Sequence, residues 1–198
     1  MNLDFTDKTV IITGGTRGIG AAIARVFLKT GAQLLVTGTK DTNPKIQGVP
    51  DGNNNVQYHQ LDFSSDDSVN KFLNAVHKLK KIDVLINCAG IFPVKKLSSA
   101  TVDEFDYCMN VNVRAPFYLI KEFSRDMIRN RWGRIVNIGS SSSYSGFKET
   151  SIYCTSKHAI LGLSRSVYEE LKNHNIRTFA ISPGSIKTKM GRKVKNQN

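Results

Sequence analysis

Short apolar segments alternate along this chain with longer segments in which apolar residues recur at helical spacing. Six of the short segments are interpreted as strands, and most of these are rich in valine and isoleucine and apolar on both faces, which is typical of strands buried inside a parallel sheet. The predicted strands span residues 8–14, 33–38, 56–63, 82–87, 133–139 and 176–182. The predicted helices lie near residues 18–30, 66–79, 101–130 and 152–174. This alternation predicts right-handed βαβ units and a doubly wound α/β sheet with a parallel core.

Two of the predicted helices begin with capping signals. Ser65 or Asp66 precedes the second helix, and Ser99 or Thr101, with Glu104 close behind, precedes the third. Side-chain oxygens at such positions accept hydrogen bonds from the free N–H groups of the first helical turn. These signals support the helical interpretation of both segments.

A long polar loop separates the second and third predicted strands. Residues 38–55 read GTKDTNPKIQGVPDGNNN and are rich in turn-forming residues. No internal repeat or linker divides the chain, and its 198 residues are enough for one sizeable core. We therefore expect a single dinucleotide-binding and catalytic domain over residues 1–198.

The composition indicates a globular cytoplasmic protein. Hydrophobic residues make up 40% of the chain and charged residues 22%, and no apolar run approaches the length of a membrane span. The first residues lack the basic start and apolar stretch of a secretion signal. The three cysteines are odd in number and form no CxxC pair, so they are interpreted as reduced thiols. The four histidines show no metal-ligand spacing, and we expect no metal site.

The net charge of +12 raises the question of a nucleic-acid partner. Five lysines and arginines lie within residues 187–198, which hold no acid, and this leaves +7 for residues 1–186. No basic stripe alternates with aromatic residues. We therefore favour a solvated surface with a basic tail, and expect neither a nucleic-acid partner nor a membrane partner.

A glycine-rich turn follows the first predicted strand and opens the first helix. The segment TGGTRGIG, residues 13–20, places Gly14, Gly18 and Gly20 at the spacing GxxxGxG. Such a turn brings backbone close to a pyrophosphate and presents the free N–H groups and dipole of a helix N-terminus to it. The context of strand, turn and helix predicts a dinucleotide-binding site.

The end of the second predicted strand bears on the choice of cofactor. An acid at this point would bind the ribose 2′-hydroxyl of NAD and repel the 2′-phosphate of NADP. The strand ends without an acid, Lys40 follows it, and Arg17 lies in the glycine-rich turn. Asp41 is the one competing acid. The charges therefore favour NADP(H), and NAD(H) remains the alternative.

The segment YCTSK, residues 153–157, places Tyr153 and Lys157 four residues apart, on one face of a helix. A free phenol has a pKa near 10. A neighbouring ammonium and an oxidised nicotinamide would both favour the phenolate and lower that pKa. The spacing therefore predicts a tyrosine general acid/base, against the alternative of a helical surface pair.

Seven segments together resemble the short-chain dehydrogenases/reductases. They are TGGTRGIG at 13–20, LDF at 61–63, NCAG at 87–90, NVN at 110–112, IGS at 138–140, YCTSK at 153–157 and SPGSIKT at 182–188. The resemblance implies a Rossmann-like sheet in the order 3-2-1-4-5-6 with helices on both faces. It also implies that the family's last helix and seventh strand are absent from this chain. Cys88 replaces the family's usual asparagine, and we expect the small thiol to be tolerated.

The resemblance implies four catalytic residues. Tyr153 would be the general acid/base, Lys157 its tuning cation and a ligand of the nicotinamide ribose, Ser140 the partner of the substrate oxygen, and Asn112 the holder of a relay water. Asp62 would meet the adenine. The implied cofactor-binding residues are Gly14, Thr16, Arg17, Gly18, Ile19, Gly20, Thr37, Thr39, Asp62, Phe63, Asn87, Ala89, Gly90, Tyr153, Lys157, Pro183, Gly184, Ile186 and Thr188.

The resemblance also suggests a function and partners. It implies an NADP(H)-dependent oxidoreductase that interconverts a ketone and a secondary alcohol, and the motifs are most similar to those of 3-oxoacyl-[acyl-carrier-protein] reductases. Arg131 stands where that group has one docking arginine, whereas His174 stands in place of a second. The alternatives are a reductase of a free small ketone or sugar and a catalytically silent dinucleotide sensor. We expect a homodimer or homotetramer buried around Phe117, Phe123 and Tyr168.

Overall fold

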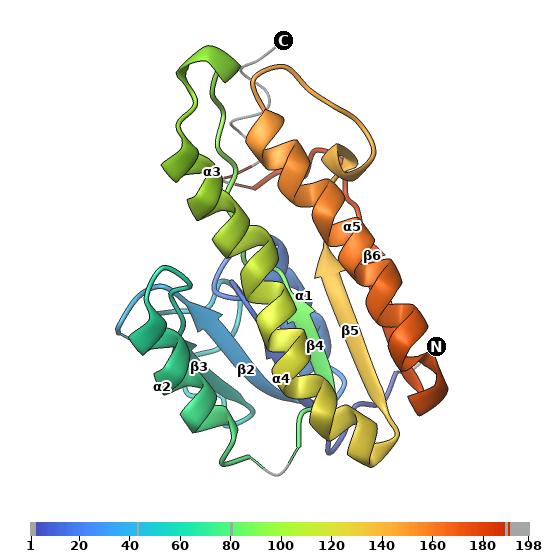
Figure 1. Cartoon of the computed structure of the whole chain (residues 1–198). Coiled ribbons are helices and arrows are strands. Elements are labelled where there is room, and N and C mark those ends of the chain that lie inside the picture. Colours follow the sequence, from blue (N-terminus) through green and yellow to red (C-terminus); the bar gives the residue numbers. More distant parts are fainter. Residues whose placement is uncertain (1–2, 43, 80, 189, 191–198) are drawn as a thin grey trace.

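The computed structural model describes residues 3–42, 44–79, 81–188 and 190, and most of the predicted basic tail lies outside them. Six parallel strands form one sheet in the order β3-β2-β1-β4-β5-β6 (Figure 1). The strands are β1 (Thr9–Ile12), β2 (Gln33–Gly38), β3 (Val56–Gln60), β4 (Val84–Asn87), β5 (Gly133–Ile138) and β6 (Ile176–Ile181). The predicted fold class and strand order are confirmed, and within the described ranges no seventh strand pairs with β6.

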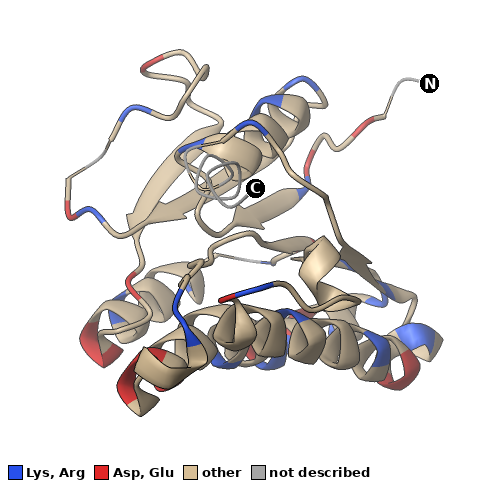
Figure 2. Ribbon diagram, turned by 90° about the horizontal axis from the view of Figure 1, so that it is seen from above, with Lys and Arg blue, Asp and Glu red and all other residues tan. Residues whose placement is uncertain are grey.

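Helices cover both faces of the sheet, as predicted. They are α1 (Gly18–Leu28), α2 (Asp66–Val76), α3 (Val102–Met109), α4 (Ala115–Asn130) and α5 (Ser151–Leu171). The helices α2, α4 and α5 form a layer on one face, and α1 lies on the other (Figures 1 and 2). Figure 2 shows basic and acidic residues interspersed along the three-helix layer. No described helix combines the length and apolar character needed to cross a bilayer.

Alternate residues of the central strands enter two separate cores. In β1, Ile11 packs into the larger cluster with α2, α4 and α5, whereas Val10 and Ile12 pack into the smaller cluster with Ala21 and Ala24 of α1. Successive side chains of a strand point to opposite faces, so a strand between two helical layers must be apolar at every position. This requirement explains the unbroken apolar runs in the sequence.

The predicted helix starts are confirmed in two places. The Ser65 side chain accepts a hydrogen bond from the backbone N–H of Ser68. Thr101 and Glu104 form a reciprocal capping box at the start of α3. The predicted helix over 101–130 continues through α3 and α4, but the turn between them, η2 (Asn110–Arg114), is π-helical. This wider turn carries Asn112 and turns its side chain into the interior, where it is 2% exposed.

An irregular segment connects β2 to β3. Parallel strands are usually joined through a helix, but here residues 39–55 contain no helix among the described positions. One side chain of this segment, Ile46, is buried in the smaller core cluster against α1. The loop predicted from polar composition is therefore present, and it packs on the same face of the sheet as α1.

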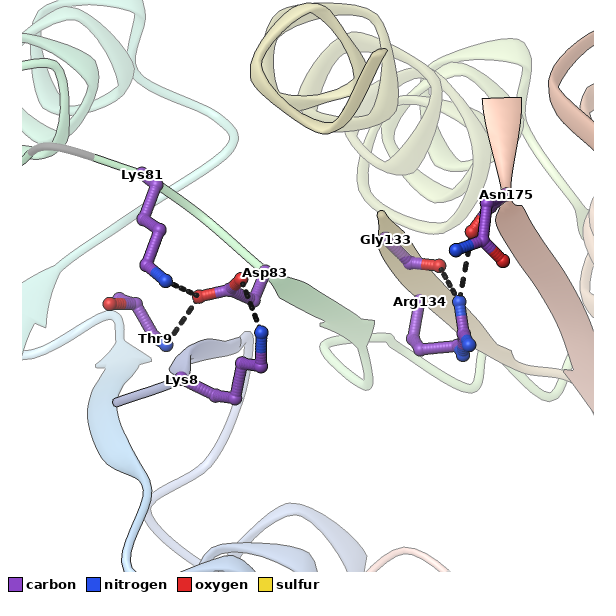
Figure 3. Close-up of polar contacts among 7 residues, drawn as sticks. All are labelled: Lys8, Thr9, Lys81, Asp83, Gly133, Arg134 and Asn175. Carbon is purple, nitrogen blue, oxygen red and sulfur yellow. Dashed lines mark hydrogen bonds and ion pairs between the residues drawn. The ribbon is translucent and has the colours of Figure 1, made fainter. Parts of the chain in front are cut away.

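The amino-terminal edge of the sheet is held by a buried carboxylate (Figure 3). Asp83 Oδ2 accepts a hydrogen bond of 3.0 Å from the backbone N–H of Thr9, and Lys8 and Lys81 form ion pairs with the same carboxylate at 3.4 and 3.7 Å. Nearby, Trp132 lies between the cations of Lys8 and Arg134, 4.3 and 4.5 Å from its ring centre. Trp132 also packs against the smaller core cluster.

One residue of the expected subunit interface was assigned wrongly. Phe123 is 1% exposed and packs inside the larger core, so it cannot contact a second chain. Phe117 is 53% exposed and Tyr168 is also exposed, and both remain available on the outer face of the helix layer. Phe117 and Phe123 are six residues apart, which places them on different faces of a helix with 3.6 residues per turn.

Replacing these two phenylalanines should therefore have opposite consequences. Phe123→Ala should lower the free energy of unfolding by about 3–5 kcal/mol, because it leaves a cavity in the core. Phe117→Ala should change it by less than about 0.5 kcal/mol at a protein concentration low enough to keep chains apart. Urea unfolding of both variants measures the difference. Equal losses in the two variants would contradict the assignment of Phe123 to the core.

Candidate active site

The candidate site lies where the order of the sheet reverses. The neighbours of β1 are β2 on one side and β4 on the other, and chains leaving the carboxyl ends of β1 and β4 turn to opposite faces. Open α/β sheets bind ligands in the crevice formed at such a point. Thr13 spans this crevice, because its Oγ1 accepts 3.0 Å hydrogen bonds from the N–H groups of Cys88 and Ala89.

The glycines of the turn permit contacts that a side chain would prevent. Gly14 has φ of +63°, and a Cβ built on it would lie 2.9 Å from Cα of Ala89. A Cβ on Gly20 would lie 2.5 Å from the carbonyl oxygen of Gly14. The backbone of the turn thus packs directly on the segment after β4 and on the first turn of α1. Gly18 faces Thr188, which lies 3.5 Å from a Cβ built on the glycine.

The start of α1 carries no acidic side chain and no cap from its own N-cap residue. Arg17 occupies that position, makes no capping hydrogen bond and is exposed. Instead, the side-chain oxygen of Gln47 accepts a 3.1 Å hydrogen bond from the N–H of Gly18. The turn therefore offers a positive helix end and a cation at the mouth of the crevice, a combination that suits an anion.

Tyr153 and Lys157 occupy the first turns of α5 and face the end of β5. The Lys157 ammonium lies 5.6 Å from the centre of the Tyr153 ring and donates a 2.7 Å hydrogen bond to the carbonyl oxygen of Ile138. The Ser140 side chain lies within hydrogen-bonding reach of the Tyr153 phenol. Both Tyr153 and Lys157 are buried. The structure thus brings together the three side chains that the sequence suggested as an acid/base group.

The pKa of Tyr153 shifts in the direction opposite to the one expected from the sequence. Burial raises the pKa of Tyr153 above its ordinary value, and the Ser140 hydrogen bond offsets part of this rise. Burial also lowers the pKa of Lys157 to about 8, since the ammonium has lost its water and gained a single carbonyl partner. The expected lowering of the phenol pKa by Lys157 is therefore wrong for the protein without a cofactor, where desolvation of the phenol dominates.

Asn112 connects the segment after β4 to α5. Its Oδ1 accepts from the Ile91 N–H at 2.9 Å, while its amide nitrogen donates to the Ile91 carbonyl and to Ser156 Oγ, both at 3.0 Å. Gly90 lies beside this amide, with a built Cβ 3.2 Å from Asn112 Oδ1 and 3.9 Å from Lys157 Nζ. Asn112 therefore fixes the backbone of residues 90–91 next to the Lys157 ammonium.

Other expected cofactor residues line the same edge of the sheet. Asn87 donates to Asn137 at 2.8 Å, but its buried Oδ1 has no partner within the described part of the chain. Asp62 accepts from the Ser64 N–H and hydroxyl, and the Thr37 carbonyl accepts from the N–H of Gly15. The remaining expected positions at this edge are Thr16, Ile19, Thr39, Pro183, Gly184 and Ile186. Ile186 is exposed and its carbonyl accepts from the N–H of Thr188.

Phe63 differs from that group because its side chain packs against the larger core. Only its carbonyl takes part in a polar contact, a 2.7 Å hydrogen bond from the Asn110 amide. We therefore place the Phe63 ring in the hydrophobic core, away from the crevice. Its position after β3 was visible in the sequence, but the direction of its side chain was not.

Two neighbours of the site were not predicted from the sequence. Phe92 packs edge-on against Tyr153, with ring centres 4.6 Å apart, and Gln47 reaches the glycine-rich turn from the loop after β2. An aromatic residue soon after NCAG is a weak signal for the first contact. Gln47 has no signal at all, since it lies inside a long polar loop.

Three features of the crevice suit a dinucleotide. The turn is cleared of side chains at Gly14 and Gly20, a cation stands at its mouth, and the Asn87 oxygen is left without a partner in the described structure. By contrast, the described residues contain no group of three or more His, Cys, Asp or Glu side chains that could hold a metal.

Comparisons with known proteins agree with this geometry. Residues 8–198 match the family model described as short chain dehydrogenase. The 3-oxoacyl-[acyl-carrier-protein] reductase FabG of Rickettsia typhi is 32% identical over 192 residues, which cover 97% of this chain and 78% of the relative.

Two solved structures show the same fold. A protein from Beutenbergia cavernae with bound NADP at low occupancy superposes with a TM-score of 0.91 at 26% identity, covering 100% of this chain and 80% of that one. A mutant 4-hydroxyisoleucine dehydrogenase with NADH and succinate superposes with a TM-score of 0.86 at 29% identity, covering 96% and 79%. Proteins similar to this chain thus hold both NADP and NADH.

The lowered pKa of Lys157 predicts a specific dependence of stability on pH. Between the folded value of about 8 and the ordinary value of 10.5, the unfolded chain binds more of this proton than the folded chain does. Stability therefore rises with pH across this window, and the rise should disappear in Lys157→Met.

Urea unfolding of the wild type and Lys157→Met between pH 7 and 10 measures this effect as a difference between the two proteins. The exposed Lys121→Met controls for the loss of one positive charge. A difference between wild type and Lys157→Met that stays constant across the range would contradict the buried ammonium.

Proposed function

Because this chain belongs to the short chain dehydrogenases, we propose that it is an oxidoreductase that interconverts a ketone and a secondary alcohol, with NADP(H) as its cofactor. The observation that carries the proposal is the convergence of Tyr153, Lys157 and Ser140 beside the crevice between β1 and β4. The nicotinamide would supply or accept the hydride. The side chains of this chain would hold the substrate and move the proton.

Tyr153 is the proton donor in the direction of reduction. Its phenol keeps its proton in the buried site, because burial raises its pKa. It can therefore give that proton to the carbonyl oxygen of a ketone as the negative charge develops there. The Ser140 hydroxyl lies beside the phenol and can donate a second hydrogen bond to the same oxygen.

Lys157 stabilises the phenolate that remains after proton transfer. Its ammonium is buried, 5.6 Å from the Tyr153 ring centre, so the attraction between the two charges is weakly screened. The hydrogen bond to the Ile138 carbonyl fixes the ammonium in this position. The remaining donor capacity of the ammonium is available to a ribose hydroxyl of the cofactor. Asn112 positions the segment between this ammonium and the crevice.

The charges near the start of α1 favour NADP(H) over NAD(H). Arg17 is exposed at the N-cap and Lys40 follows the end of β2, and neither forms an ion pair within the described residues. Both cations are thus free to meet a 2′-phosphate. Asp41 is exposed. Burial is the main cause that raises the pKa of the Tyr58 phenol, and the nearby Asp41 carboxylate also raises it. Asp41 is the acid that could bind the ribose 2′-hydroxyl of NADH and so favour NADH over NADPH.

We further propose a 3-oxoacyl group on an acyl-carrier protein as substrate, since a FabG relative shares 32% of the sequence. The position of Arg131 restricts how a carrier could dock. Arg131 lies at the amino end of β5 and donates to the Asn173 carbonyl, beyond the end of α5. Tyr153 lies at the other end of α5, about 28 Å away for 19 helical residues. One chain therefore cannot place Arg131 beside its own Tyr153.

A second copy packed antiparallel along α4 and α5 would remove this conflict. The outer face of these helices and of α3 exposes Val102, Phe105, Tyr107, Phe117 and Tyr168. A hollow of about 350 Å³ lies on the same face, between Phe117 and Leu163. Burying such a face between two chains brings the amino-terminal edge of one sheet to the carboxyl-terminal edge of the other. We therefore propose a homodimer in which Arg131 of one subunit serves the site of its partner.

Removing the phenolic hydroxyl tests the proposed chemistry. Tyr153→Phe should lower kcat by about 10²–10⁴-fold, because it deletes only the proton donor. The dissociation constant for NADPH should stay within about twofold, since Lys157 and the glycine-rich turn remain. Tyr118→Phe, which removes a hydroxyl from the edge of the larger core, is the matched control. Retention of most of the wild-type kcat in Tyr153→Phe would rule out the proposed proton donor.

Salt dependence tests the proposed substrate. With the intact protein, kcat/KM for an acetoacetyl-carrier protein should exceed that for a carrier-free acetoacetyl thioester, and the preference should shrink as salt rises. Arg131→Ala should reduce the preference, whereas Lys29→Ala, at the end of α1, should not. If the carrier makes no difference at any salt concentration, the substrate is a free small ketone, and the carrier proposal is wrong.

A further inference from the structure

Residues 46–48 of the loop after β2 are fastened across the glycine-rich turn. The N–H of Gln47 donates to the Thr16 carbonyl at 3.0 Å, and the Gln47 side-chain oxygen accepts from Gly18 at 3.1 Å. Arg25 of α1 donates to the Gln47 carbonyl at 2.8 Å. Three hydrogen bonds to one residue therefore fix the position of Gln47 against the turn.

The neighbours of Gln47 hold it in this position. Ile46 is buried in the smaller core, and Gly48 has φ of +74° with a built Cβ 2.9 Å from the Arg25 side chain. A left-handed glycine in close contact with Arg25 lets the chain turn back immediately after Gln47. Hydrogen bonds and packing thus attach residues 46–48 to the glycine-rich turn and to α1.

The side chain of Gln47 performs the capping role that Arg17 does not. The first N–H groups of a helix have no partner within the helix, and a side-chain oxygen usually accepts one of them. Here the acceptor comes from Gln47, which is 29 residues away from Gly18 in the sequence. Capping uses only the amide oxygen. The amide nitrogen carries two further donors, and these have no partner among the described residues.

Gln47 is connected to the end of β2 through Thr16, to whose carbonyl its backbone N–H donates. The Thr16 side chain reaches Gly38, with 3.1 Å between its methyl group and a Cβ built on the glycine. The carbonyl of Lys40 accepts a 2.6 Å hydrogen bond from Tyr58, whose ring also packs at Gly38. Gln47 and Arg17 are thus connected through Thr16, and Lys40 through Tyr58, to the end of β2 at Gly38. In dinucleotide-binding folds the end of the second strand meets the 2′ position of the adenosine ribose.

We propose that Gln47 determines cofactor specificity by donating its amide N–H groups to the 2′-phosphate of NADP(H), while its amide oxygen holds the start of α1. This inference rests on the proposed function. A neutral amide donor near the cations Arg17 and Lys40 favours a phosphate, because its N–H groups can donate to the phosphate oxygens without adding negative charge. A carboxylate in the same place would repel the phosphate and accept hydrogen bonds from the ribose hydroxyls of NAD.

The variant Gln47→Glu separates the two roles of this side chain. It keeps an oxygen for the Gly18 N–H, and its negative charge suits the positive end of α1, so the loop should stay fastened. It removes the donors and adds a charge beside the 2′-phosphate. The dissociation constant for NADPH should rise about tenfold or more through like-charge repulsion, whereas that for NADH should stay constant or fall.

Fluorescence titration of the intact protein with NADPH and with NADH measures both constants, and the thermal midpoint without cofactor reports the fold. Gln57→Glu, which makes the same charge change on β3, should leave the ratio of the two constants unchanged. An unchanged ratio in Gln47→Glu, or equal weakening of both cofactors, would overturn the proposal while leaving the proposed function intact. A wild-type protein that binds neither cofactor would overturn both.

Discussion

The hydroxyl of Thr13 holds together the two sides of the crevice on which the site depends. It is 1% exposed, accepts hydrogen bonds from the N–H groups of Cys88 and Ala89, and lies 3.4 Å from the Ile86 carbonyl. Without it, two partly buried N–H groups would lose their acceptor, which would destabilise this side of the crevice. The glycine-rich turn can therefore rest against the segment after β4, with Gly14 in contact with Ala89.

The same constraint orients the part of the molecule that carries the proposed catalytic residues. The segment after β4 leads to Gly90 and Ile91. The Asn112 amide, on the π-helical turn, forms hydrogen bonds with the backbone N–H and carbonyl of Ile91. The second donor of that amide reaches Ser156, on α5 between Tyr153 and Lys157. Hydrogen bonds, joined by the backbone of residues 89–91, thus link the end of β1 to the helix that carries the proposed acid/base pair. Buried polar networks of this kind specify one arrangement when all their members are satisfied.

Burial of the Lys157 ammonium lowers the stability of the folded chain, but it places a positive charge where the proposed chemistry needs one. Its hydrogen bond to Ile138 does not compensate for lost hydration, as its pKa of about 8 indicates. A solvated lysine would be more stable there but would interact only weakly with a phenolate. Desolvation therefore lowers the pKa of Lys157 and strengthens the attraction of its ammonium for a phenolate charge once one forms.

Much of the fold could be predicted because it depends on local pattern. The apolar runs required by two-sided burial predicted the central strands, and the capping signal near Thr101 predicted the start of α3. Motif spacing located the glycine-rich turn and the pair Tyr153 and Lys157. What the sequence could not supply depends on distant contacts. The burial of Phe123 follows from which helix face meets the sheet, and the position of Gln47 follows from a loop fold that no period encodes.

The direction of the Tyr153 pKa shift failed for a related reason. Helical spacing gives the separation of phenol and ammonium but not the amount of water that each one loses. In the structure this loss of water is the largest influence on the pKa of both groups, and it outweighs the effect of the short distance between them. Burial depends on the packing of whole elements around a site, so charge arguments from sequence alone overestimate the effect of a neighbouring cation.

The transfer of an isotopic label tests the central claim most directly. With acetoacetyl thioester and NADPH carrying deuterium at C4 of the nicotinamide, the intact protein should produce an alcohol with one deuterium on its carbinol carbon. Because the crevice between β1 and β4 would hold the nicotinamide with one face toward Tyr153, only one of the two C4-labelled epimers should give this product. A product without deuterium, or equal labelling from both epimers, would contradict the account.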